Sequence, residues 1–308
     1  MLLPIVNRGQ VPVVTGYRGA TASGQPTTLG RGGSDYSATL LGAVLGVDEI
    51  WIWTDVDGVL STDPRVCPHA VILDEITFGE AAELSHYGAK VIHQRAIQPA
   101  RDAAIPVWIK NSFRPEVRGT RIAATATDGA SPVKAVTAVP RCSLITLGAR
   151  QAVQPAEIFG RMFMRLAAEH VDLLFSAQSA QHALMLAVRE PDERHVVEAL
   201  RKLFRTELRH GVLEPVDVKR NVGVIAVLGE AMKGKPGILA RLFSVVAERQ
   251  VSVIAAAQGA SEFSICFAVP SEAVTQIVQS VHDELCTPPT AAPLSVAEPA
   301  RGRQEARN

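Results

Sequence analysis

The first 122 residues alternate short β-branched runs with stretches that have one apolar face. Three of the runs predict β-strands at residues 11–15, 49–54 and 105–109. Residues 36–45 predict a helix, and Thr77 with Glu80 forms a capping box that opens a second helix, which Gly88 closes. Strands that alternate with helices predict a three-layer α/β domain with a mainly parallel sheet.

The second half of the chain is a tandem repeat. The order strand, helix, strand, strand, helix occurs twice, first over residues 144–208 and then over residues 222–285. This order is the ferredoxin-like βαββαβ scheme with one strand missing from the end of each copy. Residues 134–139 form a spare strand, which we expect to complete the second unit by returning from earlier in the chain.

Two segments have no periodic apolar face. Residues 123–131 are predicted to be a linker, and residues 287–308, rich in Pro, Ala, Arg and Glu, are predicted to be a disordered tail. The predicted domains are therefore an α/β domain at 1–123, a first βαββαβ unit at 132–213 that includes the spare strand, and a second unit at 214–286.

Composition narrows the class of protein. The chain carries 31 Lys and Arg against 31 Asp and Glu, so no excess of positive charge predicts a nucleic-acid ligand. Cys67, Cys142, Cys266 and Cys286 are far apart, without the close pairing of a zinc site, so we predict no metal site and buried thiols in a reducing cytosol. No apolar run approaches the roughly 20 residues of a membrane span, so a soluble cytoplasmic protein is expected.

A glycine-rich turn at residues 27–36 runs directly into the first predicted helix. Glycines let backbone amides approach a ligand closely, and the amino terminus of a helix favours an anion. Arg31 adds a planar guanidinium group that suits a carboxylate. The alternative is an ordinary tight turn in which Ser34 and Asp35 only cap the helix, and such a turn by itself does not decide between the two.

Further polar motifs follow buried segments of the α/β domain. Residues 54–59 and 62–65 lie just beyond a predicted strand, at the carboxyl edge of the sheet, where α/β domains bind ligands. The alternative is an ordinary Asp-Gly turn. Lys90 follows a glycine-terminated helix and suits a phosphate, but Lys90 and His93 taken alone are more often solvated or structural residues.

Taken in this order and spacing, the motifs resemble those of one family. The chain is similar to the aspartate kinases of the amino-acid kinase family in five motifs, at residues 30–35 (GRGGSD), 53–58 (WTDVDG), 62–65 (TDPR), 88–93 (GAKVIH) and 118–120 (RGT). The tandem repeat of the second half resembles this family as well, because aspartate kinases carry two regulatory ACT modules of the βαββαβ type, one split around the other. The resemblance covers residues 11 to about 285.

The resemblance implies that the γ-phosphate of ATP is transferred to the side-chain carboxylate of aspartate, with Mg²⁺ held by the phosphates. This reaction opens lysine, threonine and methionine biosynthesis. The resemblance assigns Arg31, Ser34 and Asp35 to the aspartate substrate, and Asp35 with Lys90 to catalysis. The ATP-binding residues that it implies are Thr54, Asp55, Leu60, Arg65, Lys90 and Val91, with Leu60 at a position where this family often has an aromatic residue.

The two βαββαβ units are expected to bind an amino-acid effector, threonine or lysine. Gln178 and Gln258 end matching strands of the two repeats, and Gly237 lies in a turn before a helix, so all three are predicted effector contacts. The alternative for each Gln is an exposed polar residue at a strand end. Residues 255–262 look more like the threonine-responsive aspartate kinases fused to homoserine dehydrogenase than the lysine-sensitive ones. Because ACT modules usually pair side by side, a homodimer or a hetero-oligomer is expected.

One feature of the family is not found in the sequence. Aspartate kinases begin with a Lys-Phe-Gly-Gly-type segment whose lysine contacts the transferring phosphate, and nothing resembling it precedes Val11. We therefore expect a truncated, ATP-binding part of the kinase domain with an unpaired sheet edge and little kinase activity alone. The alternative is a non-catalytic regulatory subunit, or an inactive fragment, that binds an amino acid through its ACT units.

Overall fold

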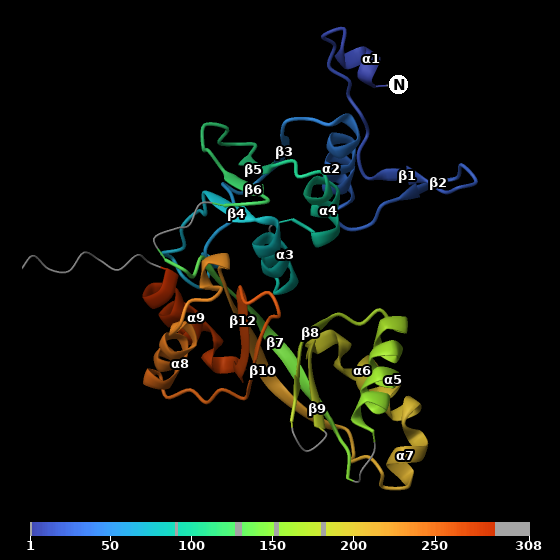
Figure 1. Cartoon of the computed structure of the whole chain (residues 1–308), viewed down its shortest axis with the longest axis vertical. Coiled ribbons are helices and arrows are strands. Elements are labelled where there is room, and N and C mark those ends of the chain that lie inside the picture. The colour runs from blue at the N-terminus through green and yellow to red at the C-terminus, as the bar shows by residue number, and fades with distance from the viewer. Residues whose placement is uncertain (1, 90–91, 127–130, 151–153, 180–182, 287–308) are drawn as a thin grey trace, which may run out of the picture.

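A computed structural model describes residues 2–89, 92–126, 131–150, 154–179 and 183–286. The amino-terminal part, up to residue 123, lies above the carboxyl-terminal part in Figure 1. Its elements are α1 (Leu3–Val6), β1 (Arg18–Ala20), β2 (Pro26–Thr28), α2 (Gly33–Leu45), β3 (Ile50–Thr54), β4 (Glu75–Thr77), α3 (Phe78–His86), α4 (Gln94–Asp102), β5 (Val107–Asn111) and β6 (Thr120–Ala123). Within the described ranges, no helix is both long and apolar enough to cross a membrane.

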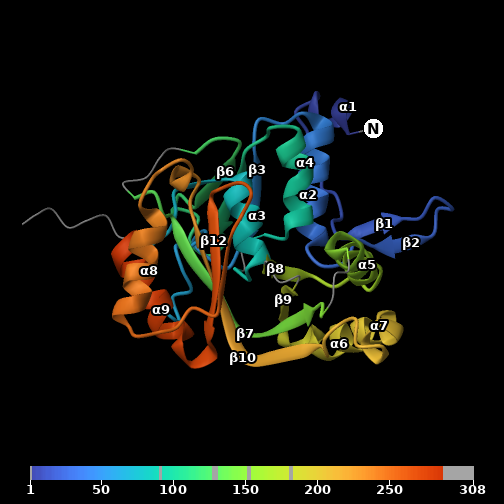
Figure 2. The same ribbon diagram turned by 60° about the horizontal axis from the view of Figure 1, so that its bottom comes forward.

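A four-stranded sheet in the order β3-β5-β6-β4 forms the centre of the amino-terminal part. Strand β3 runs parallel to β5 and β4 runs parallel to β6, whereas β5 and β6 are antiparallel. Thr54 at the end of β3 lies opposite Asn111 at the end of β5, so both strands bring their carboxyl ends to one edge. Figure 2 shows α2 and α4 side by side, with α3 nearer to the long strands of the carboxyl-terminal part. The fold is the expected α/β arrangement.

The predicted strand at residues 11–15 is wrong. These residues have no regular structure, and the Val11 and Val13 side chains are 89% and 97% exposed. β-Branched side chains favour a strand locally, but a strand also needs a partner, and Pro12 has no backbone N–H to donate. The pattern also missed β4 and β6, which are only three and four residues long. Strand β6 ends at Ala123, the first residue of the predicted linker.

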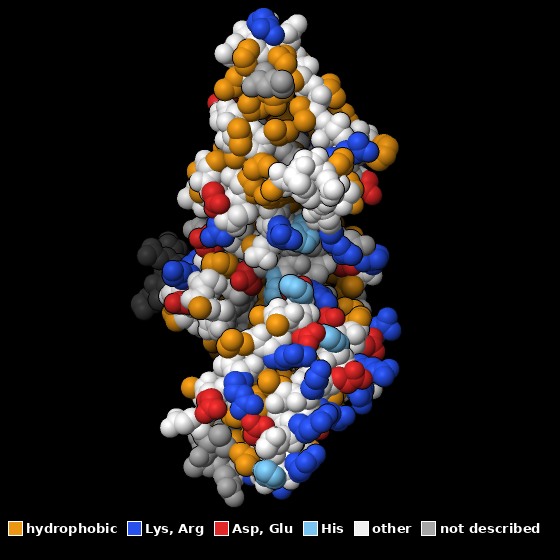
Figure 3. All heavy atoms as spheres, turned by 90° about the vertical axis from the view of Figure 1, so that its right-hand side faces the viewer, with side chains coloured by type: hydrophobic (Ala, Val, Ile, Leu, Met, Phe, Trp, Pro, Cys, Tyr) orange, Lys and Arg blue, Asp and Glu red, His pale blue; other side chains and the backbone are white. Residues whose placement is uncertain are grey.

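Large apolar side chains remain exposed on the amino-terminal part. They include Leu3, Val6, Leu40 and Val44, from α1 and α2. Figure 3 shows apolar atoms gathered over the upper end of one face, while charged atoms dominate its lower end. The two ends of the molecule therefore present surfaces of different character on this face.

The carboxyl-terminal part is built on a single six-stranded sheet in the order β11-β12-β10-β7-β9-β8. Its elements are β7 (Ala135–Gly148), α5 (Pro155–Ala168), β8 (Leu173–Gln178), β9 (Ala183–Arg189), α6 (Glu193–Leu203), α7 (Arg205–Arg209), β10 (Asp217–Leu228), α8 (Ile238–Glu248), β11 (Ala255–Gln258), β12 (Ser264–Pro270) and α9 (Val274–Val281). The predicted tail at residues 287–308 lies outside the described residues.

Strands β7 and β10 are long enough to serve both repeats. Residues 135–139 of β7 pair with the second half of β10, whereas residues 142–148 of β7 pair with β9. In return, residues 217–219 of β10 pair with the second half of β7. The register shifts near Pro140, which has no N–H for the ladder. Each repeat thus has four strands, and one of the four comes from the strand that begins the other repeat.

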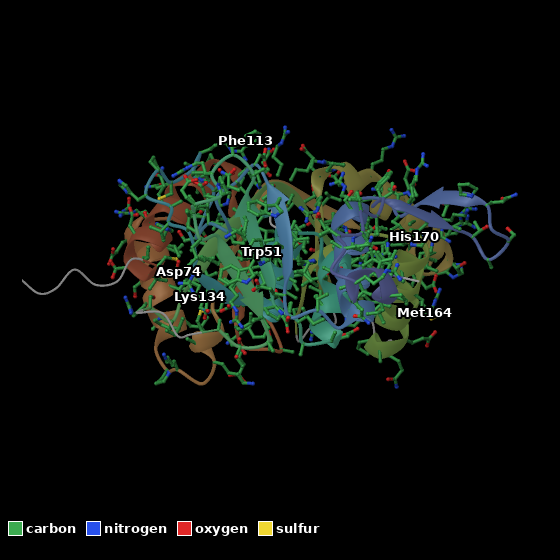
Figure 4. All side chains as sticks on the ribbon, turned by 90° about the horizontal axis from the view of Figure 1, so that it is seen from above. Trp51, Asp74, Phe113, Lys134, Met164 and His170 are labelled. Carbon is green, nitrogen blue, oxygen red and sulfur yellow. The ribbon has the colours of Figure 1, made fainter. Side chains whose placement is uncertain are left out.

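In each repeat, two helices cover the face of the sheet that points away from the amino-terminal part. In the first repeat the helices α5 and α6 enclose a core that includes Met162, Leu200 and Phe204, and in the second repeat α8 and α9 enclose one that includes Leu242 and Ile277. The other face of the sheet packs on α3 and shares one core with the amino-terminal part. In Figure 4, Lys134 lies toward the second repeat, whereas Met164 and His170 lie at the first.

Two predicted helices are interrupted. The helix predicted over residues 193–208 divides into α6 and α7 at Phe204, which is fully buried. The final predicted helix is α9 followed by a π-helical turn, His282–Cys286. Phe204 at the first break and Leu285 in the π-helical turn are both buried. Burial of such large apolar groups outweighs a small difference in helix propensity, which accounts for the breaks.

The predicted capping box opens α3 and also joins the two parts of the chain. Thr77 Oγ1 accepts from Glu80 N at 3.1 Å, and the Glu80 carboxylate accepts from Thr77 N at 2.9 Å. The same carboxylate accepts from Lys134 Nζ at 3.0 Å and from Glu230 N at 2.7 Å. The Glu80 and Lys134 side chains are only 2% and 10% exposed. A buried charge of this kind is stable only while all of its partners stay in place.

We therefore predict that Glu80→Ala destabilises the chain by about 3–5 kcal/mol, because it leaves the Lys134 ammonium group buried without a counter-charge. The free energy of unfolding from urea denaturation measures the loss. Glu198→Ala is the matched control, because the Glu198–Arg194 pair is exposed and should contribute little. The double variant Glu80→Gln with Lys134→Met should recover much of the loss. Equal effects of Glu80→Ala and Glu198→Ala would contradict this account.

Candidate functional site

The glycine-rich loop leads from β2 into α2 and packs against the start of α4. Gly30 and Gly32 have positive φ angles of 76° and 70°, a backbone region that favours glycine. A Cβ atom at Gly32 would lie 2.7 Å from His93 Cβ, and one at Gly33 would lie 2.9 Å from Tyr17 Cδ2. The loop therefore needs glycine for its backbone angles at two positions and for close packing at two.

The predicted substrate residues follow this loop. Arg31 is exposed within the loop, and Ser34 and Asp35 occupy the first turn of α2. Arg31 also lines a groove of about 730 Å³ between α2 and α4, together with Tyr36 and Arg95. Asp102 lines the same groove, so two arginines face one carboxylate there, and the remaining positive charge favours an anionic ligand. Arg95 is a further candidate that was not predicted from the sequence, although its place two residues after His93 was a usable signal.

Asp35 is half-buried, and its burial raises the pKa of its carboxyl group above the ordinary value. The helix amino terminus, by contrast, favours a negative charge at this position. A partly desolvated carboxyl group with a shifted pKa is a feature that marks candidate functional sites.

The second predicted motif lies where β3 ends. Thr54 Oγ1 donates to Asp55 Oδ1 at 3.2 Å, and the Thr54 carbonyl accepts from Ser112 N at 2.8 Å. Asp57 accepts from Asn111 Nδ2 at 2.7 Å and from Arg114 Nη1 at 2.6 Å. The structure thus brings Thr54 and Asp55 to the carboxyl edge of the sheet, as expected from the position of ligand sites in α/β domains. The Asn111 and Arg114 contacts were not predicted.

The loop after this edge is held by the RGT motif. Val59 N donates to the buried Thr120 Oγ1 at 2.8 Å, and a Cβ atom at Gly58 would lie 2.6 Å from the same oxygen. Leu60 forms an isolated β-bridge with Ile72 and is half-buried. These contacts give the Thr120 side chain a structural part in placing residues 58–60.

Of the two cations predicted to bind ATP, Arg65 and Lys90, the described residues include only Arg65. Arg65 Nη2 lies 2.6 Å from Asp63 Oδ2 on the surface, and this neighbouring carboxylate raises the pKa of the guanidinium group. A phosphate would have to compete with Asp63 for Arg65. Lys90 and Val91 lie outside the described residues. His93 acts as the amino-terminal cap of α4, because its Nδ1 accepts from Arg95 N at 3.3 Å.

An aromatic cluster on the β3–β5 surface was also missed. Lys110 Nζ lies 5.1, 5.8 and 5.7 Å from the ring centroids of Trp51, Trp53 and Trp108. Glu49 accepts from the indole N–H groups of Trp51 and Trp108, each at 2.8 Å. Figure 4 shows Trp51 on this sheet. The alternation of Trp51 and Trp53 along one strand was a signal for a shared face.

The predicted effector residues lie in the two repeats. Gln178 is the last residue of β8 and Gln258 is the last residue of β11, and both are exposed. These strands are the two edges of the six-stranded sheet, which curls so that some of their Cα atoms come within 8 Å of one another. Gly237 caps α8 with a φ angle of 86°. Gln178 and Gln258 thus occupy equivalent strand ends in the two repeats.

Comparisons with known proteins agree with this architecture. The amino acid kinase family profile matches residues 2–111, and an ACT domain profile matches residues 225–285. The chain is 34% identical over 281 residues to the bifunctional aspartokinase/homoserine dehydrogenase of Haemophilus influenzae, and 32% identical over 285 residues to lysine-sensitive aspartokinase 3 of Escherichia coli. These alignments cover 91% and 92% of the chain but only 34% and 62% of the two relatives.

A solved structure supports the same assignment. The crystal structure of Escherichia coli aspartokinase III in complex with aspartate and ADP matches with a TM-score of 0.77 and 30% sequence identity. The match covers 92% of this chain and 62% of that one. The fold and the profiles define the class, an amino acid kinase domain joined to ACT-type regulatory structure. Within this class the chain belongs to the aspartokinase family.

The raised pKa of Asp35 leads to a pH-dependent prediction. A carboxyl group with a raised folded-state pKa costs stability as the pH rises from its unfolded pKa through its folded pKa, because the folded state binds more protons in that window. Asp35→Asn removes this cost. The unfolding free energy of Asp35→Asn minus that of the wild type should therefore increase as the pH rises above about 4, the ordinary pKa of an unfolded aspartate, and level off once the pH exceeds the folded-state pKa.

Urea denaturation at a series of pH values measures this difference. Ser34→Ala is the control, because it changes the neighbouring residue without removing an ionisable group and should give a difference that does not vary with pH. A difference for Asp35→Asn that stays flat, or decreases, across the same range would show that burial does not control the Asp35 carboxyl group.

Proposed function

We propose that the chain serves the aspartate kinase reaction, with aspartate and ATP as substrates. One observation carries this proposal: the glycine loop with Arg31 and the polar strand edge at Thr54 and Asp55 occur in one domain, at the motif positions of aspartokinases. The relative solved with aspartate and ADP has the same fold over 92% of this chain. We assign Arg31, Ser34 and Asp35 to aspartate.

The ATP-binding residues in this proposal are Thr54, Asp55, Leu60, Arg65, Lys90 and Val91, and Lys90 and Asp35 are the catalytic residues. A side-chain carboxylate oxygen of aspartate forms a bond to the γ-phosphorus, and the bond from that phosphorus to the β–γ bridging oxygen breaks. The products are ADP and 4-phospho-aspartate. Such a reaction needs positioning and charge neutralisation more than covalent help. Cationic side chains and glycine amides provide both.

The cation of this reaction is proposed to be Mg²⁺, held through the phosphates of ATP. Both carboxylate oxygens of Asp57 already accept hydrogen bonds, from Asn111 and Arg114, which supports a cation bound by phosphates rather than by this side chain. Bound Mg²⁺ would neutralise charge on the phosphates. Arg65 would contribute further charge after exchanging its Asp63 partner for a phosphate oxygen.

Regulation is proposed to act through the two repeats. An amino-acid effector, threonine or lysine, would contact Gln178, Gln258 and Gly237, and the protein would form a homodimer or a hetero-oligomer through these repeats. The matched strand-end positions of the two glutamines support this assignment. The four cysteines are free and three are buried, which supports a reducing compartment such as the cytoplasm.

Binding measurements on the reduced full-length chain test the two halves of the proposed site separately. Calorimetry with aspartate, and with ADP and Mg²⁺, should detect both ligands. Arg31→Ala should weaken aspartate binding by about tenfold or more while leaving ADP within about twofold, because a charge-assisted bond is worth roughly 1.5–3 kcal/mol. Arg65→Ala should show the opposite selectivity.

Arg194→Ala is the matched control, because Arg194 is an exposed arginine of α6, far from both motifs in the sequence. It should change neither affinity. Loss of both ligands in every variant, or of neither, would contradict the assignments. If threonine or lysine binds while aspartate and ADP do not, the chain acts as a regulatory unit rather than as part of a kinase site.

A further inference from the structure

Three potential metal ligands from distant parts of the sequence meet between the two parts of the molecule. Cys67 belongs to the loop that follows β3, whereas His282 and Asp283 belong to the π-helical turn after α9. Their ligand atoms all lie within 4.8 Å of one another. Cys67 and His282 are 1% and 2% exposed. We call these three residues the Cys67 cluster; no role in aspartate or ATP binding is assigned to them.

The loop that carries Cys67 is fixed to the second repeat at several points. Val136 N of β7 donates to the Ser61 carbonyl at 2.8 Å, and Gln279 Nε2 of α9 donates to the Val66 carbonyl at 2.6 Å. The position of Cys67 relative to His282 therefore does not depend on the cluster alone. Ligands held in place before a metal arrives lose less conformational entropy on binding it.

The spacing of the three ligand atoms fits a tetrahedral ion. Zinc bonds of about 2.3 Å to sulfur and about 2.0–2.2 Å to nitrogen and oxygen place neighbouring ligand atoms roughly 3.4–3.6 Å apart. In the cluster, Cys67 Sγ is 3.4 Å from His282 Nδ1, His282 Nδ1 is 3.4 Å from Asp283 Oδ1, and Cys67 Sγ is 3.9 Å from Asp283 Oδ1. Two of the three edges match within the range, and the third is slightly longer.

The histidine ring has the second partner that a metal ligand needs. His282 Nε2 lies 2.8 Å from Ser61 Oγ, and Ser61 Oγ also accepts from Val71 N at 3.0 Å. In the tautomer that donates from Nε2 to Ser61, the lone pair of Nδ1 faces Cys67 and Asp283. Metal-ligating histidines commonly use their outer N–H in this way. The same distances also allow a hydrogen-bonded triad in which the Cys67 thiol and His282 Nδ1–H both donate to Asp283 Oδ1, so metal titration is the test that separates the two arrangements.

The fourth position is open toward solvent. His69 Nδ1 lies 4.0 Å from Asp283 Oδ1, and its side chain is 81% exposed, so it can move closer to complete the ligand set. Asp283 also lines a groove of about 400 Å³ between α8 and α9, so its carboxylate is accessible from solvent. The π-helical turn is a second independent feature, because such turns occur often at functional sites.

We propose that Cys67, His282 and Asp283 bind a divalent zinc ion, with His69 or water as the fourth ligand. A thiolate, an imidazole and a carboxylate are together a ligand set that suits Zn²⁺ better than Mg²⁺ or Ca²⁺. Binding converts the Cys67 thiol to a thiolate and releases its proton to solvent. The ion joins the loop that contains Arg65 to the last helical segment of the second repeat and thus clamps the two parts of the chain together.

Cobalt substitution tests this site in the untagged full-length chain, kept reduced with a phosphine and freed of metal with a chelator. Titration with Co²⁺ should produce a thiolate-to-cobalt charge-transfer band that saturates at one ion per chain, and Zn²⁺ should abolish the band by displacement. Cys67→Ser should eliminate the band. Asp283→Asn should retain it but weaken Zn²⁺ binding by about tenfold to 100-fold, because one anionic ligand is lost.

Two control variants separate this site from adventitious binding. Cys286→Ser changes the cysteine three residues after Asp283, which interacts electrostatically with Cys67, and Glu284→Gln changes the exposed acidic residue beside Asp283. Both variants should bind Co²⁺ and Zn²⁺ like the wild type. Asp283 is exposed, so Asp283→Asn should fold even if Cys67→Ser does not. The proposal is overturned if the wild type gives no charge-transfer band, or if Asp283→Asn binds Zn²⁺ as tightly as Glu284→Gln does.

Discussion

The buried carboxylate of Glu80 is the interaction on which the arrangement of the two parts depends. It caps α3 at Thr77, neutralises Lys134 and accepts from Glu230 N, just after β10 in the second repeat. The desolvation of two charges is compensated only when all of these donors are in place, so the carboxylate tolerates one arrangement of α3 on the sheet. The other end of α3 is fixed as well, because Arg189 Nη2 of the first repeat donates to the His86 carbonyl at 2.7 Å.

Because β7 and β10 each belong to both repeats, the regulatory sheet behaves as one layer rather than as two modules joined by a linker. Helix α3 packs on this layer, α4 packs on α3, and His93 at the start of α4 packs against Gly32 of the candidate substrate loop. Packing is therefore continuous from the sheet to the glycine loop. Interiors of this density transmit displacement instead of absorbing it, so under the proposed regulation a ligand that prefers one arrangement of the sheet would also bias the loop.

The candidate site is built from features that cost stability. Asp35 keeps a carboxylate half-buried, and the loop at Gly30 and Gly32 uses backbone angles that few residues adopt. Arg65 and Asp63 form an ion pair on the surface, where Arg65 can readily exchange Asp63 for another anionic partner. The structural elements nearby are, by contrast, well satisfied: Thr120 holds the loop at Val59, and the capping box holds α3. This division between a site with a partly desolvated carboxyl group and an exchangeable ion pair, and a frame whose polar groups are satisfied, is typical of functional proteins.

The sequence by itself determined the elements whose signals are local. The capping box at Thr77 and the helix beginning near Tyr36 depend on residues close together in the chain. The repeat of the second half and the order of the kinase motifs are patterns along the chain, which need no knowledge of its folding. Tertiary structure alone decided which segments find partners. Residues 11–15 have strand-forming side chains but remain irregular, Glu80 meets Lys134 across 54 positions, and Cys67 meets His282 across 215. Contacts of such long sequence separation leave no periodic signal, because packing in three dimensions creates them.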